Sequence, residues 1–369
     1  MSPPNELLLN PRLPAAQLAL YEAAWLSLVE PAFKNQIGIA TSGSTGEMGR
    51  LILLSRAALE ASARAVNERF LSDANDVWFK SLPDFHVGGL GIRIRARLSG
   101  ASVFEDPSPK WDARTFAIDT ERARATLISL VPTQVFDLVQ AQVRAPESVR
   151  AVIVGGGRLE ENLRLRACEL GWPCLPSYGM TETCSQIATA LSTHDPSLIL
   201  LSHAEARTAA DGRLQVRGSS LLSAQIVFDS KNAATLVDPK VDGWFTAEDH
   251  AKVVGTALTI EGRTSDFVKI SGEGVVIARL EERLDRLKLE TGFRGDIALL
   301  AAKDARLGAT LVLIATEDAT TLIDLFNSGV APFERIKRTE RVESIPRSAL
   351  GKLQRGLALR QIGLEPVTN

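Results

Sequence analysis

The chain has 369 residues, of which 45% are hydrophobic and 23% charged, and its formal net charge is -2 at pH 7. This length predicts two or three domains, and the composition is typical of a globular protein that can bury a large core. The small net charge and the scattered basic residues exclude a basic field for nucleic acid, so we expect no nucleic-acid partner.

The three cysteines, Cys168, Cys174 and Cys184, are odd in number and lack the paired spacing of a structural zinc site. They indicate reduced thiols in a cytoplasmic protein. The N-terminus has no basic lead into an apolar segment, and no later run is apolar over the length of a membrane span. We therefore expect no export signal and no membrane partner.

The first predicted elements surround a loop that is rich in hydroxyls and glycines. A helix is predicted over residues 15–34 and a strand over 37–41. The loop that follows consists of Thr41, Ser42, Gly43, Ser44, Thr45 and Gly46. Glycines let successive backbone N–H groups face an anion and hydroxyls add donors, which makes a polyphosphate the natural ligand. The Lys-Ser or Lys-Thr pair of a Walker loop is missing, and taken alone the stretch also fits a surface turn.

Strands and helices then alternate along the chain. A strand is predicted at 51–54, Ser55 caps a helix, and buried strands are predicted at 77–83, 126–134 and 151–154. Loops after these strands carry His86 and the glycines Gly155, Gly156 and Gly157, although His86 alone also fits a histidine satisfied within the fold. The alternation predicts an α/β fold, whose ligand lies outside the carboxyl ends of the strands.

Residues 176–184 are predicted to form a polar turn containing Tyr178, Thr181 and Glu182. Mg²⁺ prefers carboxylate and phosphate oxygens, so Glu182 is a candidate ligand for a metal bound to phosphates. Thr181 is a candidate phosphate donor, and Tyr178 is a candidate to stack on a base. The alternative is a helix-start turn in which Glu182 lies near a positive helix end.

Three later stretches complete a set of motifs. They are Asp242-Gly243-Trp244-Phe245 with Asp249, Gly262-Arg263 with Gly272, and Pro346-Arg347 to Gly351-Lys352 with Arg355. Together with the Thr41–Gly46 loop and the Tyr178–Glu182 stretch, they resemble in order the acyl-adenylate-forming enzymes, from about Ile37 to Arg355. Within these enzymes, the stretches around His86, Val131–Gln134, Gly155–Gly157 and Tyr178–Gln186 are most similar to the o-succinylbenzoate-CoA ligases of menaquinone biosynthesis.

The resemblance implies an ATP-dependent acid–CoA ligase that uses ATP, Mg²⁺ and coenzyme A. A carboxylate attacks the α-phosphate of ATP, and the thiol of coenzyme A then attacks the acyl-adenylate. The implied substrate is a small-molecule aromatic carboxylic acid. The alternatives are an acyl- or aryl-CoA ligase for another acid, an enzyme that passes the acyl group to a carrier, and a nucleotide-binding relative that has lost catalysis.

The same resemblance implies roles for individual residues. The implied catalytic residues are Lys352, Thr181 and Glu182, with Glu182 as the Mg²⁺ ligand. The implied nucleotide-binding residues are Thr41, Ser42, Gly43, Ser44, Thr45, Gly46, Arg50, Gly155, Gly156, Gly157, Tyr178, Asp249, Arg263 and Gly272. The implied acid-binding residues are His86, Val131, Thr133, Gln134, Gly179, Ser185 and Gln186. Apart from His86 this last set holds no cation, so we expect neutral donors such as Ser185, Gln134 and Gln186 to hold a second carboxylate.

Two departures from the family pattern bear on the nucleotide. Gly49 stands where relatives have lysine, and Arg50 follows it; a guanidinium also binds phosphate, with a different reach. Glu248 precedes Asp249 where glycine is usual, and a carboxylate near a triphosphate is unfavourable unless it points away. The region before the loop is short, so we expect an N-terminally shortened large domain, and a homo-oligomer is one way of completing it.

We expect two domains. Residues 1–263 form the nucleotide- and acyl-binding domain, with stacked sheets and helices, and residues 264–369 form a small, mobile α+β domain that carries Lys352. In the small domain a helix is predicted at 279–289, strands at 297–302 and 309–315, and a helix at 320–326. The implied rotation of this domain between half-reactions places a hinge near Arg263.

Overall fold

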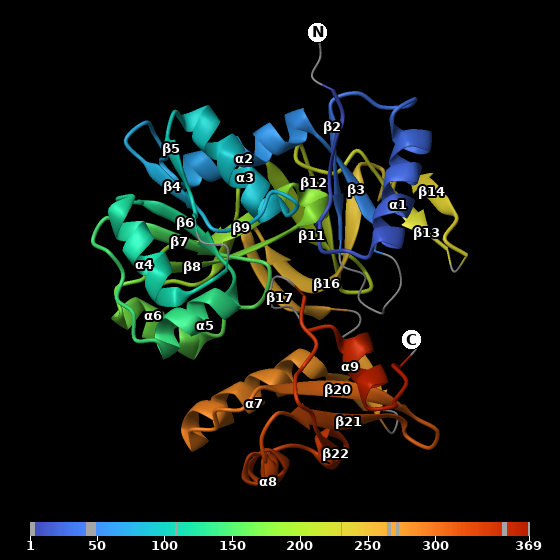
Figure 1. Cartoon of the computed structure of the whole chain (residues 1–369). Helices are drawn as coiled ribbons and strands as arrows, with labels where there is room; N and C mark the ends of the chain where they lie inside the picture. The colour runs from blue at the N-terminus through green and yellow to red at the C-terminus, as the bar shows by residue number, and fades with distance from the viewer. Residues whose placement is uncertain are drawn as a thin grey trace. The chain divides into compact units, whose positions relative to one another are not determined.

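The computed structural model of the protein describes residues 4–41, 49–107, 110–229, 231–263, 267–270, 273–348 and 353–367. The chain divides into two compact units, whose elements Figure 1 labels. The second unit contains Ile260–Asn369 and Glu248–Ala251, and the first contains most of the remaining chain. Among the helices described, none is both long and apolar enough to cross a lipid bilayer.

A five-stranded sheet begins the first unit, in the order β1-β2-β3-β13-β14. Its strands are β1 (Glu6–Leu8), β2 (Gln36–Ala40), β3 (Leu51–Ser55), β13 (Ala224–Phe228) and β14 (Ala234–Val237). β2 and β3 pair antiparallel, with Ile37 opposite Leu54, which confirms the two strands predicted on either side of the loop.

Two helices adjoin this sheet. Helix α1 (Ala15–Ala24) continues into a π-helical turn (Trp25–Val29), so the predicted helix over 15–34 ends early. Pro31 has no backbone N–H with which to extend the helical hydrogen bonds. Helix α2 (Arg56–Phe70) begins as predicted at Ser55, whose Oγ accepts a hydrogen bond from the Ala58 N–H at 3.0 Å. The cap satisfies an N–H that has no partner within the helix.

The large sheet contains five parallel strands in the order β5-β4-β6-β7-β8. They are β4 (Val77–Lys80), β5 (Ser102–Glu105), β6 (Leu127–Leu130), β7 (Ala151–Val154) and β8 (Cys174–Met180). The helices between them are α3 (Val87–Ser99), α4 (Ala113–Arg122), α5 (Pro132–Gln140) and α6 (Glu161–Glu169).

Both faces of these parallel strands are covered by helices. Successive side chains on a strand point to opposite faces, so Trp78 packs with residues of α2 and α3 while Phe79 packs with residues of α4, α5 and α6. Figure 1 shows α4, α5 and α6 together beside β6, β7 and β8. This arrangement confirms the predicted α/β fold class.

The strand β8 joins the parallel half of the sheet to an antiparallel half, because it runs parallel to β7 and antiparallel to β9. The sheet continues in the order β9-β10-β17-β16-β12-β11, with β15 paired to β16. These strands are β9 (Ser185–Ala190), β10 (Leu198–Leu200), β11 (Ala204–Thr208), β12 (Arg213–Gly218), β15 (Lys240–Val241), β16 (Trp244–Val254) and β17 (Ala257–Arg263).

Two predicted boundaries in this region are wrong. The turn predicted at 176–184 is a strand as far as Met180, because β7 and β9 pair with both edges of β8, and a short 3₁₀ helix (Thr181–Thr183) follows. The strand predicted at 126–134 ends at Leu130, and Pro132 begins α5. Proline suits the first turn of a helix, where its missing N–H costs no hydrogen bond.

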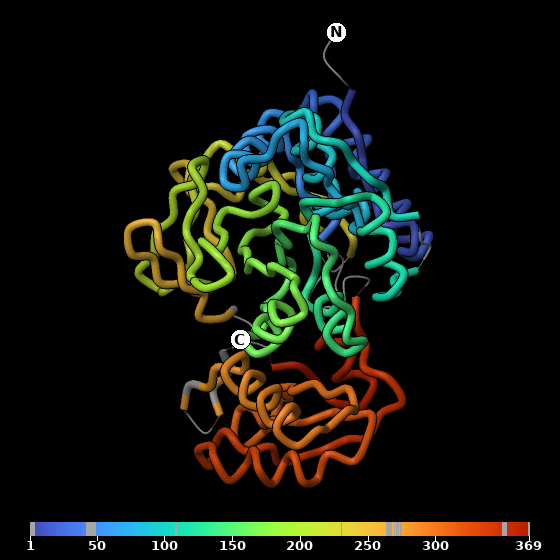
Figure 2. Tube along the Cα trace, turned by 90° about the vertical axis from the view of Figure 1, so that its left-hand side faces the viewer, coloured from blue at the N-terminus to red at the C-terminus, as the bar shows by residue number. Residues whose placement is uncertain are grey.

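The second unit has α+β composition and confirms the elements predicted for it. Its described elements are β18 (Phe267–Ile270), β19 (Glu273–Val276), α7 (Ile277–Thr291), β20 (Ile297–Asp304), β21 (Gly308–Ala315), α8 (Thr320–Ser328), β22 (Ile336–Arg341) and α9 (Arg355–Gln361). Helices α7 and α8 share one core with β20 and β21, and α9 shares a second core with the same strands. Figure 2 shows this part of the chain in orange and red.

Candidate active site

The loops after β6 and β7 meet beside β8 at the carboxyl edge of the parallel strands. The Gly155 N–H donates to the Leu130 carbonyl at 3.1 Å, and the Ser177 hydroxyl donates to the Val154 carbonyl at 3.0 Å. A Cβ on Gly156 would lie 3.4 Å from the Val131 side chain. The structure therefore brings together the glycine run, Val131 and the start of the Tyr178 stretch, as the sequence predicted.

The glycine run is shaped by its backbone. Gly156 has φ +75°, a left-handed conformation that favours glycine. A Cβ on Gly155 would lie 3.0 Å from the Ser177 hydroxyl oxygen. Gly156 and Gly157 are exposed, so the run offers an open backbone surface against which a flat ring can lie.

Of the predicted phosphate loop, Ser42, Gly43, Ser44, Thr45 and Gly46 lie outside the described residues. Both ends of the loop are described. The N–H and hydroxyl of Thr41 donate to the Arg50 carbonyl at 2.8 and 3.2 Å. The hydroxyl of the buried Tyr21 donates to the Gly49 carbonyl at 2.9 Å. These bonds anchor the base of the loop to β2 and α1.

The structure brings Arg50 and Glu182 together. Their Nη1 and Oε1 atoms lie 3.9 Å apart, and the side chains are 40% and 13% exposed. The Glu182 carbonyl also accepts from the Leu222 N–H at 2.8 Å, which holds the Thr181–Thr183 turn against the region before β13. The described residues contain no cluster of three His, Cys, Asp or Glu that could hold a metal alone. A metal at Glu182 would therefore need oxygens from its ligand, as Mg²⁺ on a nucleotide does.

Asp249 and Glu248 lie side by side on β16, and they differ in burial. Asp249 is buried whereas Glu248 is exposed. Because neighbouring side chains on a strand point to opposite faces, Glu248 points away from the side where Asp249 lies, which is the condition that the sequence required of the extra carboxylate. Arg263 ends β17, and Gly272 and Lys352 lie outside the described residues.

His86 lies at the N-terminal cap of α3, in the loop after β4. Burial lowers the pKa of its imidazole to about 4, so the ring is neutral at pH 7. Its Nε2 is buried and has no hydrogen-bond partner among the described residues. An unpaired buried nitrogen of this kind is available to a ligand.

The predicted neutral donors have partners within the protein. The Gln134 side-chain oxygen accepts from the Val131 N–H at 3.0 Å and thereby caps α5. The Gln186 amide donates to the Thr189 hydroxyl at 2.6 Å in a buried position. Thr133 is exposed on α5. A Cβ on Gly179 would lie 2.0 Å from the Ser185 carbonyl oxygen, so only glycine lets β8 and β9 approach here.

Arg95 is a functional candidate that the sequence reasoning missed. Its side chain is buried at 1% exposure, its Nη2 donates to the Ser185 hydroxyl at 2.9 Å, and its guanidinium lies 5.5 Å from the Trp78 ring centre. The described residues supply no carboxylate partner to it, and burial lowers its pKa to about 10, so it stays charged. The signal was its spacing of three residues from Ile92, which places both side chains on the buried face of α3, a helix that the sequence analysis did not predict.

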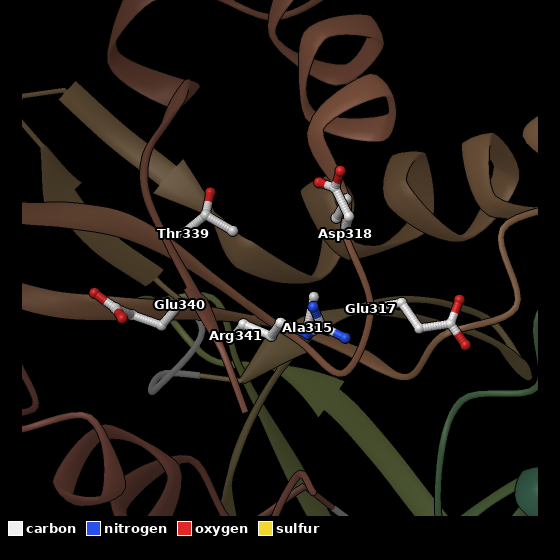
Figure 3. Close-up of a pocket in the computed structure, with 7 residues that line it drawn as sticks. Ala315, Glu317, Asp318, Thr339, Glu340 and Arg341 are labelled. Atoms are coloured by element: carbon white, nitrogen blue, oxygen red, sulfur yellow. The ribbon is translucent and has the colours of Figure 1, made fainter. Parts of the chain in front are cut away.

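A separate cavity of about 330 Å³ lies within the second unit (Figure 3). Its lining residues are Ala315, Glu317, Asp318, Ala319, Thr339, Glu340 and Arg341. None of the predicted site residues contributes to this cavity, so it does not belong to the candidate active site.

A glycine run and a Thr-Glu turn at the carboxyl edge of parallel strands are typical of a nucleotide-binding α/β enzyme domain. Residues 38–209 match the family described as AMP-binding enzyme, so this part of the chain is similar to AMP-binding enzymes. The match agrees with the family that the sequence motifs resemble.

Curated relatives and solved structures agree with this assignment. The chain is 27% identical to the 2-succinylbenzoate–CoA ligase of Enterococcus faecalis, over 85% of this chain and 67% of that protein. It is 30% identical to the indoleacetate–CoA ligase of Aromatoleum aromaticum, over 85% of this chain and 65% of that protein. A solved o-succinylbenzoate CoA synthetase from Bacillus subtilis, in complex with its acyl-adenylate intermediate, has the same fold (TM-score 0.74, 24% identity, 89% of this chain and 68% of that one). The chain thus spans about two thirds of its relatives' length.

Proposed function

We propose that the protein is an ATP-dependent acid–CoA ligase, and that its acid is an aromatic dicarboxylate of the o-succinylbenzoate type. The observation that carries the proposal is the meeting of Val131, the glycine run, the Tyr178 stretch and the Arg50–Glu182 pair around the ends of parallel strands. The named activities of the curated relatives support the same reaction class. The cytoplasmic location and a homo-oligomeric state remain predictions, to be tested by fractionation and by light scattering.

In this proposal the nucleotide lies along β8 and the loops beside it. Tyr178 and the glycine run flank the adenine, Asp249 accepts from the ribose hydroxyls, and Thr181 donates to the α-phosphate. Glu182 holds Mg²⁺, which when bound would neutralise phosphate charge. The Glu182 carboxylate fits this role because Mg²⁺ prefers carboxylate oxygens and the side chain lies in the turn directly after β8.

Arg50 and Lys352 supply the positive charge that adenylation needs. The first step brings a carboxylate anion onto a phosphate anion, so cations must neutralise the approach. Lys352 is proposed to bridge the two anions from the second unit, in a domain that begins after Arg263 and rotates between the half-reactions. Arg50 is proposed to take the place of the missing loop lysine on the β- and γ-phosphates.

Arg95 supports the choice of a dicarboxylate. A buried guanidinium is expensive to keep without an anionic partner, and the described residues offer it only a serine hydroxyl and an aromatic face. A second carboxylate on the acid would supply the missing partner through charge-assisted hydrogen bonds. We propose that Arg95, acting with Ser185, replaces Gln134 and Gln186 in this role, since the Gln134 side chain is held by its cap of α5 and the Gln186 amide already donates to Thr189.

The relative that acts on indoleacetate favours a second candidate, an aryl-CoA ligase for a monocarboxylate. The test is pyrophosphate release and thioester formation with o-succinylbenzoate, indole-3-acetate, benzoate and no acid. The proposal predicts the highest kcat/KM with o-succinylbenzoate. A higher value with a monocarboxylate would favour the second candidate, and no release above the acid-free rate with any of them would refute both.

A further inference from the structure

We propose that Asp84 is a positioning residue for the acid pocket, because its carboxylate ties the loop carrying His86 to a ring of four charges at the ends of β4 and β5. The inference rests on the proposed function, and on the acid-binding role that the family resemblance implies for His86. The ring consists of Lys80, Asp84, Arg93 and Glu105. None of these four residues was predicted from the sequence to belong to the site.

The four side chains of the ring contact one another in alternating charge order. Lys80 Nζ lies 3.3 Å from Asp84 Oδ1 and 3.3 Å from Glu105 Oε2. Arg93 Nε lies 3.0 Å from Asp84 Oδ2, and Arg93 Nη1 lies 2.9 Å from Glu105 Oε1. Two cations and two anions therefore close a neutral ring in which each charge has two opposite neighbours.

The ring is built on rigid elements, apart from Asp84. Lys80 is the last residue of β4 and lies directly opposite Glu105, the last residue of β5, in the parallel ladder. Arg93 lies within α3. Asp84 alone comes from the loop between β4 and α3, so its carboxylate links that loop to the strand and to the helix.

The ring differs from a surface ion pair in its burial. The Lys80 side chain is only 8% exposed, whereas the side chains of Asp84, Glu105 and Arg93 are 32%, 48% and 51% exposed. A buried ammonium group must be paired to remain charged. The buried Lys80 therefore restrains the carboxylates of Asp84 and Glu105, and it fixes Asp84 more firmly than a solvent-exposed ion pair would.

The backbone transmits the position of Asp84 to His86. The His86 N–H donates to the Pro83 carbonyl at 3.2 Å, and the His86 carbonyl accepts from the Gly89 and Leu90 N–H groups at 3.0 Å each. A Cβ on Gly89 would lie 2.3 Å from the Pro83 carbonyl oxygen, so the loop is packed tightly on the start of α3. If Asp84 no longer pairs with the other charges of the ring, the loop can move, and the imidazole of His86 moves with it.

The first test measures amide hydrogen exchange in the Asp84→Asn variant of the full chain. Asparagine keeps the shape of the side chain and removes its charge. The matched control is Asp211→Asn, which breaks a comparable pair with Arg213 (2.7 Å) in the turn between β11 and β12. We expect exchange at His86, Gly89 and Leu90 to rise about fivefold or more in Asp84→Asn and to stay unchanged in the control. Unchanged exchange in Asp84→Asn would overturn the inference, whatever the enzyme's activity.

The second test is steady-state kinetics with whichever acid the wild-type protein uses best. Asp84→Asn is expected to raise the KM for the acid about fivefold to tenfold and to change the KM for ATP and kcat less than about twofold. Asp84→Glu, which keeps the charge, is expected to recover most of the acid KM. A uniform loss of kcat with both KM values unchanged would mean a merely structural role and would refute the positioning role.

The two tests separate this inference from the function on which it rests. If wild type releases pyrophosphate with an acid other than o-succinylbenzoate, the kinetic test is run with that acid and keeps its meaning. If wild type releases none with any acid, the proposed function fails and the link between Asp84 and an acid pocket fails with it. In that case hydrogen exchange still measures whether the ring holds the loop.

Discussion

Replacing His203 with glutamine should make the stability of the first unit less sensitive to acid. His203 lies in the turn before β11, and neither of its ring nitrogens has a hydrogen-bond partner among the described residues. Burial, together with the positive charge of Arg95, lowers the pKa of His203 from 6.5 to about 4. The unfolded chain therefore binds more protons at this residue than the folded chain does between pH 4 and 6.5.

The sign and size of the effect follow from this difference. Where the unfolded state binds more protons, the free energy of unfolding rises with pH, so it falls when the solution is acidified through this window. At pH 5 the His203 site lowers the unfolding free energy by about 2 kcal/mol relative to pH 7. The His203→Gln variant lacks this contribution, while the lowered pKa of His86 contributes equally to both proteins and cancels in the comparison.

The assay is urea denaturation of both proteins at pH 7 and pH 5, followed by tryptophan emission. The five tryptophans, Trp25, Trp78, Trp111, Trp172 and Trp244, all belong to the first unit, so the emission reports on that unit. On going from pH 7 to pH 5, the unfolding free energy of wild type should fall by about 2 kcal/mol more than that of the variant. The exposed His194→Gln is the control for the loss of one histidine. If the difference in unfolding free energy between wild type and His203→Gln is the same at both pH values, the reasoning is refuted.

Three further predictions concern catalysis. Arg95→Met should lower kcat/KM for o-succinylbenzoate about 10-fold to 100-fold, because a charge-assisted hydrogen bond is lost. The kcat/KM for benzoate should fall less than about threefold. Equal losses for both acids would mean that Arg95 does not recognise the substrate. Arg50→Ala should raise the KM for ATP about tenfold and leave the KM for the acid unchanged, and an unchanged ATP dependence would mean that the loop binds phosphate without it. Lys352→Ala should slow adenylate formation at least about 100-fold and leave thiolation of a supplied acyl-adenylate within about twofold of wild type, and equal losses in both half-reactions would contradict the role of Lys352.

The sequence was sufficient to predict the parts of the fold that depend on the local chain. Ser55 and Gly155–Gly157 have signatures that are written into a few consecutive residues, and the alternation of strands and helices predicted that their loops would share one edge. The strand at Pro176–Met180 was missed because its polar side chains resemble a turn. Its extended backbone is fixed by pairing with β7 and β9, which the local sequence does not contain.

Arg95 and Asp84 were missed for a different reason. The role of a guanidinium on a buried helix face depends on the residues that it contacts. For Arg95 the contact is Ser185, which comes from a strand distant in the sequence. Asp84 pairs with residues of β4 and α3 and joins β5 through them, although a single aspartate in a loop most often faces water. Gln134 shows the converse: its amide suited substrate binding, yet it caps α5. A Gln134→Leu variant therefore cannot separate substrate binding from helix stability.

The position of β8 in the sheet has a consequence for engineering the enzyme. One strand carries Tyr178, proposed for the base, and Gly179, which packs against the backbone of Ser185 beside the proposed acid. The proposed base side and the proposed acid side of the site therefore share one strand, whose register at these two residues is fixed by β9. A change in β8 made to admit a larger acid would also move the base. Selection for new acids should accordingly succeed most readily at α3 and the loop before it, which carry the proposed acid-binding residues Arg95 and His86 on another element and leave the proposed nucleotide side undisturbed.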